Sequence, residues 1–221
     1  FTYSTSSAIT PISPAYTDVI VEKYGISPRK IHLVYAGADL SKFDHRKDCL
    51  KQKRGGRGFK VLYIGALSLA YDFDQVLESA RLLSSNNNIE FIIQGGGELG
   101  PTLRSKVKKM RLLNVKVRLK IVSRNRVPKI LNEADALILP LSGLKAVEMG
   151  ISSKLYEYQA SGRPIICCSG GQPAKYISKT KSGIVVKPGD SKGLAKAILY
   201  LHKNREICEK LGSAGRRYVE D

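Results

Sequence analysis

The sequence predicts an α/β protein built on a Rossmann-like, doubly wound parallel sheet. From residue 60 onward, short apolar runs alternate with segments whose apolar residues recur at helical spacing. Most of the runs are apolar throughout, as expected where helices cover both faces of a sheet. Several runs end in glycine. We expect about six strands, with a ligand bound at their carboxyl ends.

The expected elements follow one another regularly. The expected strands cover residues 60–65, 89–94, 115–122, 135–140, 163–168 and 183–188. The expected helices cover residues 73–83, 102–113, 126–134, 152–162, 172–178, 191–202 and 204–220. This order is typical of βαβ units in one sheet.

Local signals support individual elements. The helix over residues 73–83 gathers its apolar residues on one face: Phe73, Val76, Leu77, Ala80 and Leu83. Residues 115–122 alternate as a strand does, and the helix over 126–134 has an early proline. The helix over 152–162 stops at Gly162, a residue that commonly ends helices.

The first 57 residues differ from the rest. They predict a short strand-like start, a helix around residues 18–25 and a strand over residues 31–39. Residues 45–60 are charged and glycine-rich, which is typical of an exposed linker. We therefore divide the chain into residues 1–57 and a Rossmann-like domain over residues 58–221.

The charge balance is strongly basic: 37 Lys and Arg against 19 Asp and Glu give a net charge of +18. Such a field attracts nucleotides, phosphates, polyanions or an acidic membrane surface, and it also favours solubility. A nucleic-acid-binding domain is disfavoured, because aromatic residues make up 7%, Trp is absent, and basic and aromatic residues are not interleaved.

The four cysteines predict small core residues in a reducing compartment. Cys49, Cys167, Cys168 and Cys208 form no Cys-x-x-Cys pair and no cluster with histidine, so no metal site is expected. No apolar run approaches the roughly 18 residues that span a bilayer, and no signal peptide is visible. The chain starts at Phe1 rather than Met, which we interpret as a piece of a longer protein.

Glycines close two of the expected strands. Gly65 follows the first, and Gly95, Gly96 and Gly97 follow the second. A glycine there lets a ligand approach the backbone, although it can also simply turn the chain. The spacing of Gly95, Gly97 and Gly100 is no dinucleotide fingerprint, because it does not follow the first strand and no acidic residue comes about twenty positions later. No P-loop motif is present.

The segment "ISSKLYEYQASGRPII", residues 151–166, places a lysine and a glutamate near the start of an expected helix. Ser152 or Ser153 is a good helix N-cap, and Lys154 then opposes the helix dipole unless an anion binds there. Glu157 lies one turn later on the same face. The pair predicts a phosphate near Lys154 and a sugar diol near Glu157. The alternative is a surface ion pair between the two side chains.

Six stretches occur in an order that resembles the C-terminal, donor-binding half of family 4 GT-B glycosyltransferases: "VYAGADLSKF", "VLYIGALS", "IEFIIQGGGEL", "VPKILNEADALILP", "SSKLYEYQASGRPII" and "GIVVKPGDSKGLAKAILYL". The resemblance covers about residues 9–221. It implies that residues 1–57 hold the end of an N-terminal, acceptor-binding domain and the linker, and that residues 58–221 bind a nucleotide sugar.

The resemblance also implies roles for single residues. Glu157 matches the glutamate that holds the ribose, and Gly95, Gly96 and Gly97 match the glycine loop on the diphosphate side. Gly65 closes the first strand beside this site. Ile121 and Val122 match the backbone that meets the base, whereas Ser153 and Lys154 match a subgroup with Ser-Lys before the helix.

Two positions depart from the family pattern. Many members carry an Arg and a Lys after the first strand for the diphosphate, where this chain has Ala66 and Tyr71, so Lys154 is a candidate to replace them. The two family glutamates are usually eight positions apart, but Glu148 and Glu157 are nine apart. Glu148 is thus a candidate catalytic residue near the sugar, or a solvated loop glutamate.

The resemblance implies a retaining hexosyltransferase that uses a UDP- or GDP-sugar as substrate, with no cofactor and no obligatory metal. The acceptor is expected to be a glycan or a lipid-phosphate, in polysaccharide biosynthesis, in the cytoplasm or peripherally at the inner membrane face. We expect no transfer by this chain alone, and no nucleic-acid partner. The alternatives are a sugar-nucleotide 2-epimerase of GT-B type and a basic nucleic-acid-binding domain.

Overall fold

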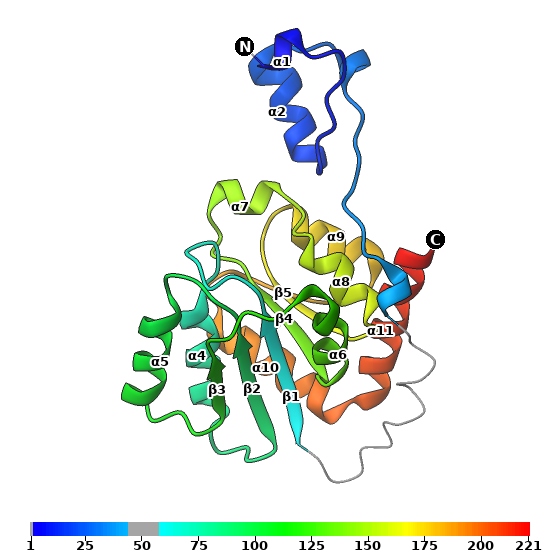
Figure 1. Cartoon of the computed structure of the whole chain (residues 1–221). Helices are drawn as coiled ribbons and strands as arrows, with labels where there is room; N and C mark the ends of the chain where they lie inside the picture. The colour runs from blue at the N-terminus through cyan, green and yellow to red at the C-terminus, as the bar shows by residue number, and fades with distance from the viewer. Residues whose placement is uncertain (1, 44–57) are drawn as a thin grey trace.

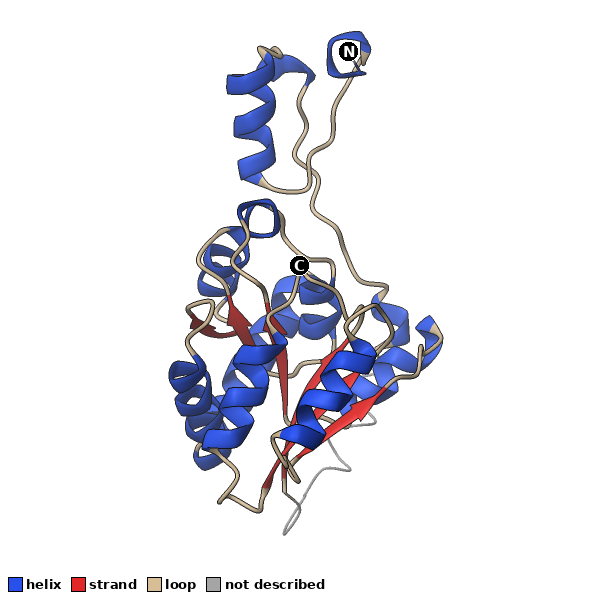
Figure 2. Cartoon of the chain, turned by 90° about the vertical axis from the view of Figure 1, so that its left-hand side faces the viewer, coloured by secondary structure: helices blue, strands red, loops and turns tan. Residues whose placement is uncertain are grey.

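The computed structural model describes residues 2–43 and 58–221. These residues form two parts, a larger α/β part and a smaller helical part that stands above it in both views (Figure 1, Figure 2). Residues 44–57, which contain Cys49 and most of the expected linker, lie outside the described residues. The division into domains at residue 57 stays a prediction.

A six-stranded sheet forms the centre of the larger part. Its strands are β1 (Phe59–Ile64), β2 (Ile89–Gln94), β3 (Val115–Arg118), β4 (Ala136–Pro140), β5 (Ile165–Cys168) and β6 (Gly183–Val186). Their order is β3-β2-β1-β4-β5-β6, and every neighbouring pair is parallel. The predicted Rossmann-like sheet is thus confirmed.

Helices cover both faces of the sheet (Figure 1). They are α4 (Phe73–Leu82), α5 (Gly100–Lys109), α6 (Val127–Asn132), α7 (Lys145–Met149), α8 (Lys154–Ala160), α9 (Gln172–Thr180), α10 (Ser191–Lys203) and α11 (Arg205–Glu220). Residues on β1 alternate between two cores: Val61 packs with α4 and α10, whereas Leu62 packs with α6 and α8. This alternation follows from the two-residue period of a strand.

Burial of the strands explains the cysteines. Cys167 and Cys168 point to opposite faces of β5, both are fully buried, and Cys208 on α11 is buried too. The prediction of buried free thiols is confirmed for these three residues. Burial raises the pKa of the Cys167 thiol, because the thiolate would lose its hydration.

Two expected strands were wrong in extent. Strand β3 ends at Arg118, not at residue 122, because Lys120 N–H turns back to the Arg118 carbonyl at 2.9 Å. Residues 31–39 form no strand: Ile31 makes a single parallel bridge with Ile9, and Val34 is 53% exposed. Residues 9–11 do run beside this segment, since His32 N–H donates to the Ile9 carbonyl at 2.9 Å and Val34 N–H to the Pro11 carbonyl at 3.0 Å, but Pro11 has no N–H to continue the ladder.

The smaller part comprises α1 (Thr2–Thr5), α2 (Pro14–Tyr24) and the 3-10 turn η1 (Pro28–Lys30), and the chain then descends to η2 (Leu40–Lys42) (Figure 2). Gly25, in the left-handed conformation, ends α2 as expected from "DVIVEKYG". The Ser13 hydroxyl donates to the Met149 carbonyl of α7 at 2.5 Å. This bond ties the smaller part to the loop that precedes α8.

No helix within residues 2–43 and 58–221 is long and apolar enough to cross a membrane.

Candidate functional site

The sheet order places a switch point between β1 and β4, where the chain connections diverge. Two of the expected site segments lie at or beside this point, at the carboxyl ends of neighbouring strands. Gly65 follows β1, and the glycines from 95 to 97 follow β2, the neighbour of β1. In doubly wound sheets ligands bind in this crevice at the carboxyl ends of the strands.

The two glycine loops interlock. Gly65 N–H donates to the Gln94 carbonyl at 2.9 Å, and Leu67 N–H donates to the Gly96 carbonyl at 2.8 Å. Gly95 has φ +157°, and a Cβ on it would overlap the Gly65 carbonyl oxygen. Only glycine fits both the backbone angle and the space, so Gly95 allows the two loops to pack this closely.

Lys154 of α8 reaches over Gly65. Its Nζ donates to the Tyr71 hydroxyl at 3.0 Å and lies 5.2 Å from the centre of the Tyr71 ring. A Cβ on Gly65, which has φ +148°, would overlap Lys154 Cε and lie 2.9 Å from Nζ. The structure thus brings together Gly65 and Lys154, which are separated by 89 positions in the sequence.

Lys154 and Glu157 form no ion pair in the structure. The Lys154 ammonium, half-buried, contacts the Tyr71 hydroxyl instead, and no carboxylate of the described residues pairs with it. Glu157 is also half-buried, and its carboxylate has no hydrogen-bond partner among the described residues. The alternative of a surface ion pair is therefore wrong, and both charges lack an opposite charge within the described chain.

Polar contacts hold α8 firmly in place. Gln159, fully buried, donates through Nε2 to the hydroxyls of Thr180 and Ser182, both at 3.1 Å, and accepts from the Tyr176 hydroxyl at 2.9 Å. Arg216 of α11 donates to the Ala160 carbonyl at 2.6 Å. These contacts anchor α8 to α9, to Ser182 just before β6, and to α11, and so fix where Lys154 and Glu157 lie.

Ser153 lies at the start of α8, and Ile121 lies beside the second glycine loop. Ser153 is the N-cap residue of α8, as expected, but its hydroxyl makes no capping bond. A Cβ on Gly96 would lie 2.9 Å from Ile121 Cγ1, so the Ile121 side chain lies against the glycine loop while remaining 82% exposed. Val122 is half-buried and packs on the core under α6 and α8.

Glu148 lies on α7, at the carboxyl end of β5. Its Oε2 accepts from the Ser169 hydroxyl and from the N–H groups of Gly170 at 3.1 Å and Gly171 at 2.5 Å. Its Oε1 is buried and has no hydrogen-bond partner in the described chain. Glu148 is thus no solvated loop residue, and one of its oxygens still lacks a donor.

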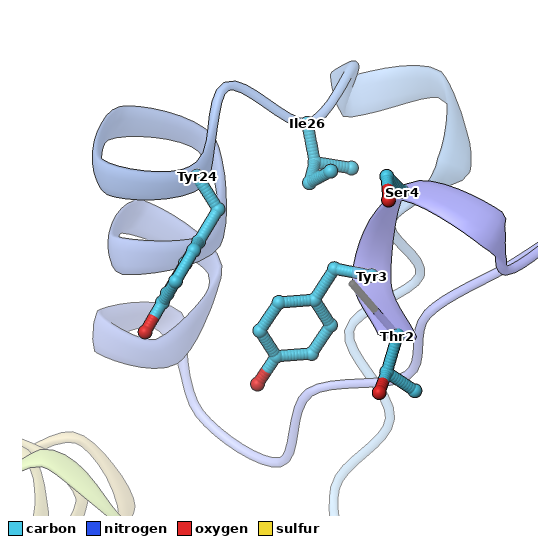
Figure 3. Close-up of a pocket in the computed structure, with 5 residues that line it drawn as sticks. All are labelled: Thr2, Tyr3, Ser4, Tyr24 and Ile26. Carbon is cyan, nitrogen blue, oxygen red and sulfur yellow. The ribbon is translucent and has the colours of Figure 1, made fainter.

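A hollow of about 580 Å³ lies elsewhere, in the smaller part (Figure 3). It is open to solvent between α1 and α2, where Tyr3 and Tyr24 pack edge to face with ring centres 5.2 Å apart. It holds none of the expected site residues; Thr2, Tyr3, Ser4, Tyr24 and Ile26 line it. No cluster of His, Cys, Asp or Glu that could hold a metal occurs among residues 2–43 and 58–221.

Sequence reasoning missed two contacts at the site. Tyr71 was noted only as a departure from the family pattern, although its hydroxyl meets Lys154. The loop Ser169–Gly170–Gly171, which binds Glu148, was not singled out at all. A Ser-Gly-Gly directly after a buried strand was the available signal, because such a loop exposes backbone N–H groups.

Comparisons with known proteins agree with this architecture. Mannosylfructose-phosphate synthase from Agrobacterium fabrum is 22% identical over 96% of this chain and 49% of its own length. O-antigen chain mannosyltransferase C from Escherichia coli is 28% identical over 72% of this chain and 41% of its own length. The chain thus spans about half the length of these curated relatives or less.

Solved structures match the fold. The crystal structure of Anabaena Alr3699/HepE in complex with UDP and glucose superposes with a TM-score of 0.81 at 16% identity, over 99% of this chain and 59% of that one. Residues 45–218 match the family described as glycosyl transferases group 1. The chain belongs to the glycosyl transferases group 1 family.

Proposed function

We propose that this chain is the donor-binding half of a glycosyltransferase, which transfers a sugar from a nucleotide sugar to a glycan or lipid-linked acceptor. The family membership supports the reaction class. The two curated relatives named above are, by name, a mannosylfructose-phosphate synthase and a mannosyltransferase. A retaining hexosyltransferase is the form of the reaction that we propose.

The single observation that carries the proposal is the half-buried, unpaired ammonium of Lys154 at the switch point. Because its partner in the described chain is the neutral Tyr71 hydroxyl, the positive charge of Lys154 remains available to an anion. A nucleoside diphosphate carries such an anion. Lys154 would then stabilise the charge that develops on the departing diphosphate, which is the electrostatic part of catalysis.

The neighbouring groups suit the rest of a nucleotide sugar. The unpartnered Glu157 carboxylate can accept two hydrogen bonds from the ribose hydroxyls. Gly95, Gly96 and Gly97 leave room for the diphosphate to approach the backbone, with Gly65 beside them. Ile121 and Val122 would meet the base, and Ser153 would lie near the phosphates.

Glu148 is proposed to face the transferred sugar. Its Oε2 accepts hydrogen bonds from the loop before α9, whereas the buried Oε1 has no donor in the described chain. A sugar hydroxyl could supply that hydrogen bond, and a buried acceptor left unpaired otherwise costs free energy. Glu148 is therefore our candidate for a catalytic contact to the sugar ring.

The partners and the location are also proposals. A UDP- or GDP-sugar is the expected substrate, without a metal or cofactor, and the acceptor would bind in a further domain. The net charge of +18 would favour peripheral contact with an anionic inner membrane face. Because the chain spans only about half of its relatives, we expect it to bind donor without transferring sugar.

A sugar-nucleotide 2-epimerase of GT-B type is the second candidate. It would share the fold and the nucleotide site, but it also needs acid and base residues aimed at the sugar. Incubating the full-length protein with donor and no acceptor separates the two, because an epimerase forms the epimer whereas a transferase gives nothing or slow hydrolysis.

A thermal-shift screen against UDP-, GDP- and ADP-sugars tests the proposal on this chain. A ligand at 100 times its dissociation constant should add about 2.7 kcal/mol to the free energy of unfolding. We expect stabilisation by one nucleotide class. No shift with any of them, at concentrations up to several millimolar, would contradict the proposed function.

A further inference from the structure

We propose that Tyr71 is a positioning residue, which holds the Lys154 ammonium at the place where the diphosphate binds. The inference rests on the proposed function of the same site, and it assigns a role to a side chain that does not itself touch the reacting atoms. Three features support the inference: the contacts of Lys154, the packing that holds Tyr71 in place, and the absence of charge on the Tyr71 hydroxyl.

The contacts restrict a flexible side chain. Lys154 has a long stem with several rotatable bonds, and an unrestrained ammonium would sample many positions. Here the Tyr71 hydroxyl accepts a hydrogen bond from Nζ at 3.0 Å, and Nζ lies 5.2 Å from the centre of the Tyr71 ring, at its hydroxyl end. Gly65 supplies the space through which the stem passes, since a Cβ there would overlap Cε.

Tyr71 is itself well fixed. Its backbone pairs with Leu141, just beyond β4, in an antiparallel bridge, and its N–H donates to the Ser68 carbonyl at 3.1 Å. Its ring packs on the buried Tyr63, with ring centres 5.1 Å apart, and on Phe73. The Tyr71 hydroxyl, which accepts from Lys154, is therefore held between the carboxyl ends of β1 and β4.

The neutrality of the hydroxyl explains why a tyrosine suits this position. A carboxylate would orient Lys154 equally well, but it would cancel the positive charge that an anionic ligand needs. The Tyr71 oxygen uses one of the three ammonium hydrogens, and the other two stay available. Tyr71 thus fixes the direction of Lys154 while leaving its charge for the diphosphate.

The test is a double-mutant cycle of Tyr71→Phe and Lys154→Ala, read by calorimetric titration with UDP, GDP and ADP and with their nucleosides. Tyr71→Phe keeps the ring and removes the hydrogen bond. We expect about fivefold weaker binding of the diphosphate and unchanged binding of the nucleoside. In the Lys154→Ala background, Tyr71→Phe should change diphosphate affinity by less than about twofold.

Tyr156→Phe is the matched control. Tyr156 lies on α8, the helix that carries Lys154, and its buried hydroxyl has no hydrogen-bond partner in the described chain. Its removal should leave both affinities unchanged, which shows that loss of a tyrosine hydroxyl near α8 is not enough. Unfolding curves of all variants confirm that the fold is kept.

The outcomes separate this inference from the proposed function. If Lys154→Ala weakens diphosphate binding and Tyr71→Phe does not, the role of Tyr71 is refuted and the proposed site stands. An equal effect of Tyr71→Phe with and without Lys154 also refutes it, because Tyr71 then acts independently. If the wild type binds no nucleoside diphosphate, both the inference and the proposed function fail.

Discussion

The two ends of α8 treat their polar groups in opposite ways. At the C-terminal end, Gln159 is fully buried and hydrogen-bonded to three side chains, Thr180, Tyr176 and Ser182. At the N-terminal end, Lys154 has only a neutral tyrosine and Glu157 has no partner among the described residues. The same seven-residue helix therefore carries a buried, fully hydrogen-bonded side chain at one end and two charges without an opposite charge in the described chain toward the other.

This difference separates structure from function. A buried polar group that is fully hydrogen-bonded stabilises a unique packing. Lys154 and Glu157 are only half-buried, so water can hydrate their charges in the empty protein and a ligand can replace that water. Substitutions at the anchored end should thus act on stability, and substitutions at the open end should act on binding.

The largest expected effect concerns the interlocked glycine loops after β1 and β2, against which Lys154 packs. Gly95→Ala should lower the free energy of unfolding by about 4 kcal/mol or more, because the new Cβ would overlap the Gly65 carbonyl at a φ that alanine avoids. Denaturant unfolding measures this. Gly37→Ala is the control, since nothing lies within 4 Å of its Cβ position. Equal stability of the two variants would show that the interlocked loops are not needed.

Glu157→Ala should weaken nucleotide binding about a hundredfold, because two charge-assisted hydrogen bonds to the ribose would be lost. Its stability should change by less than about 0.5 kcal/mol, since the carboxylate makes no hydrogen bond in the described chain. Calorimetric titration with the nucleotide that the wild type binds gives the first value. Unchanged affinity would mean that Glu157 does not contact the ribose.

Gln159→Ala should do the opposite. Removing it leaves the buried Tyr176 hydroxyl without an acceptor and takes one donor from Thr180 and Ser182, which still bond each other, and this should cost about 2 kcal/mol of stability. Nucleotide affinity of the folded protein should stay within about threefold of the wild type. A variant that loses affinity but not stability would contradict the contrast between the two ends.

The smallest expected effect is a chemical one. Cys167 and Cys168 should react slowly with a thiol reagent in the native state, because both are fully buried and burial raises the pKa of the thiols. Mass spectrometry after timed labelling at pH 8 follows each residue. Labelling of both as fast as in urea would show that β5 is not covered on its two faces.

The sequence predicts repeated and buried features well. The six strands and their order of alternation with helices follow from apolar runs, and the glycine loops follow from the residues that close those runs. Burial of Cys167 and Cys168 also follows, since a run such as "RPIICC" can only be a covered strand.

Features that depend on a distant partner were not predictable in this way. Residues 31–39 read as a strand, but the segment that pairs with them contains Pro11, which has no N–H to continue the ladder. The contact between Lys154 and Tyr71 joins residues 83 positions apart, and only the sheet order brings them together. The same holds for Glu148, whose hydrogen-bond donors lie on the loop of Ser169, Gly170 and Gly171, more than twenty positions later.

The account is tested most directly by titrating Lys154→Ala with a nucleoside diphosphate and with its nucleoside. Lys196→Ala, an exposed lysine on α10, controls for the loss of one positive charge. We expect Lys154→Ala to bind the diphosphate at least about tenfold more weakly and the nucleoside within twofold, with Lys196→Ala unchanged. Equal losses for both ligands, or no loss for either, would contradict the claim that Lys154 holds the diphosphate.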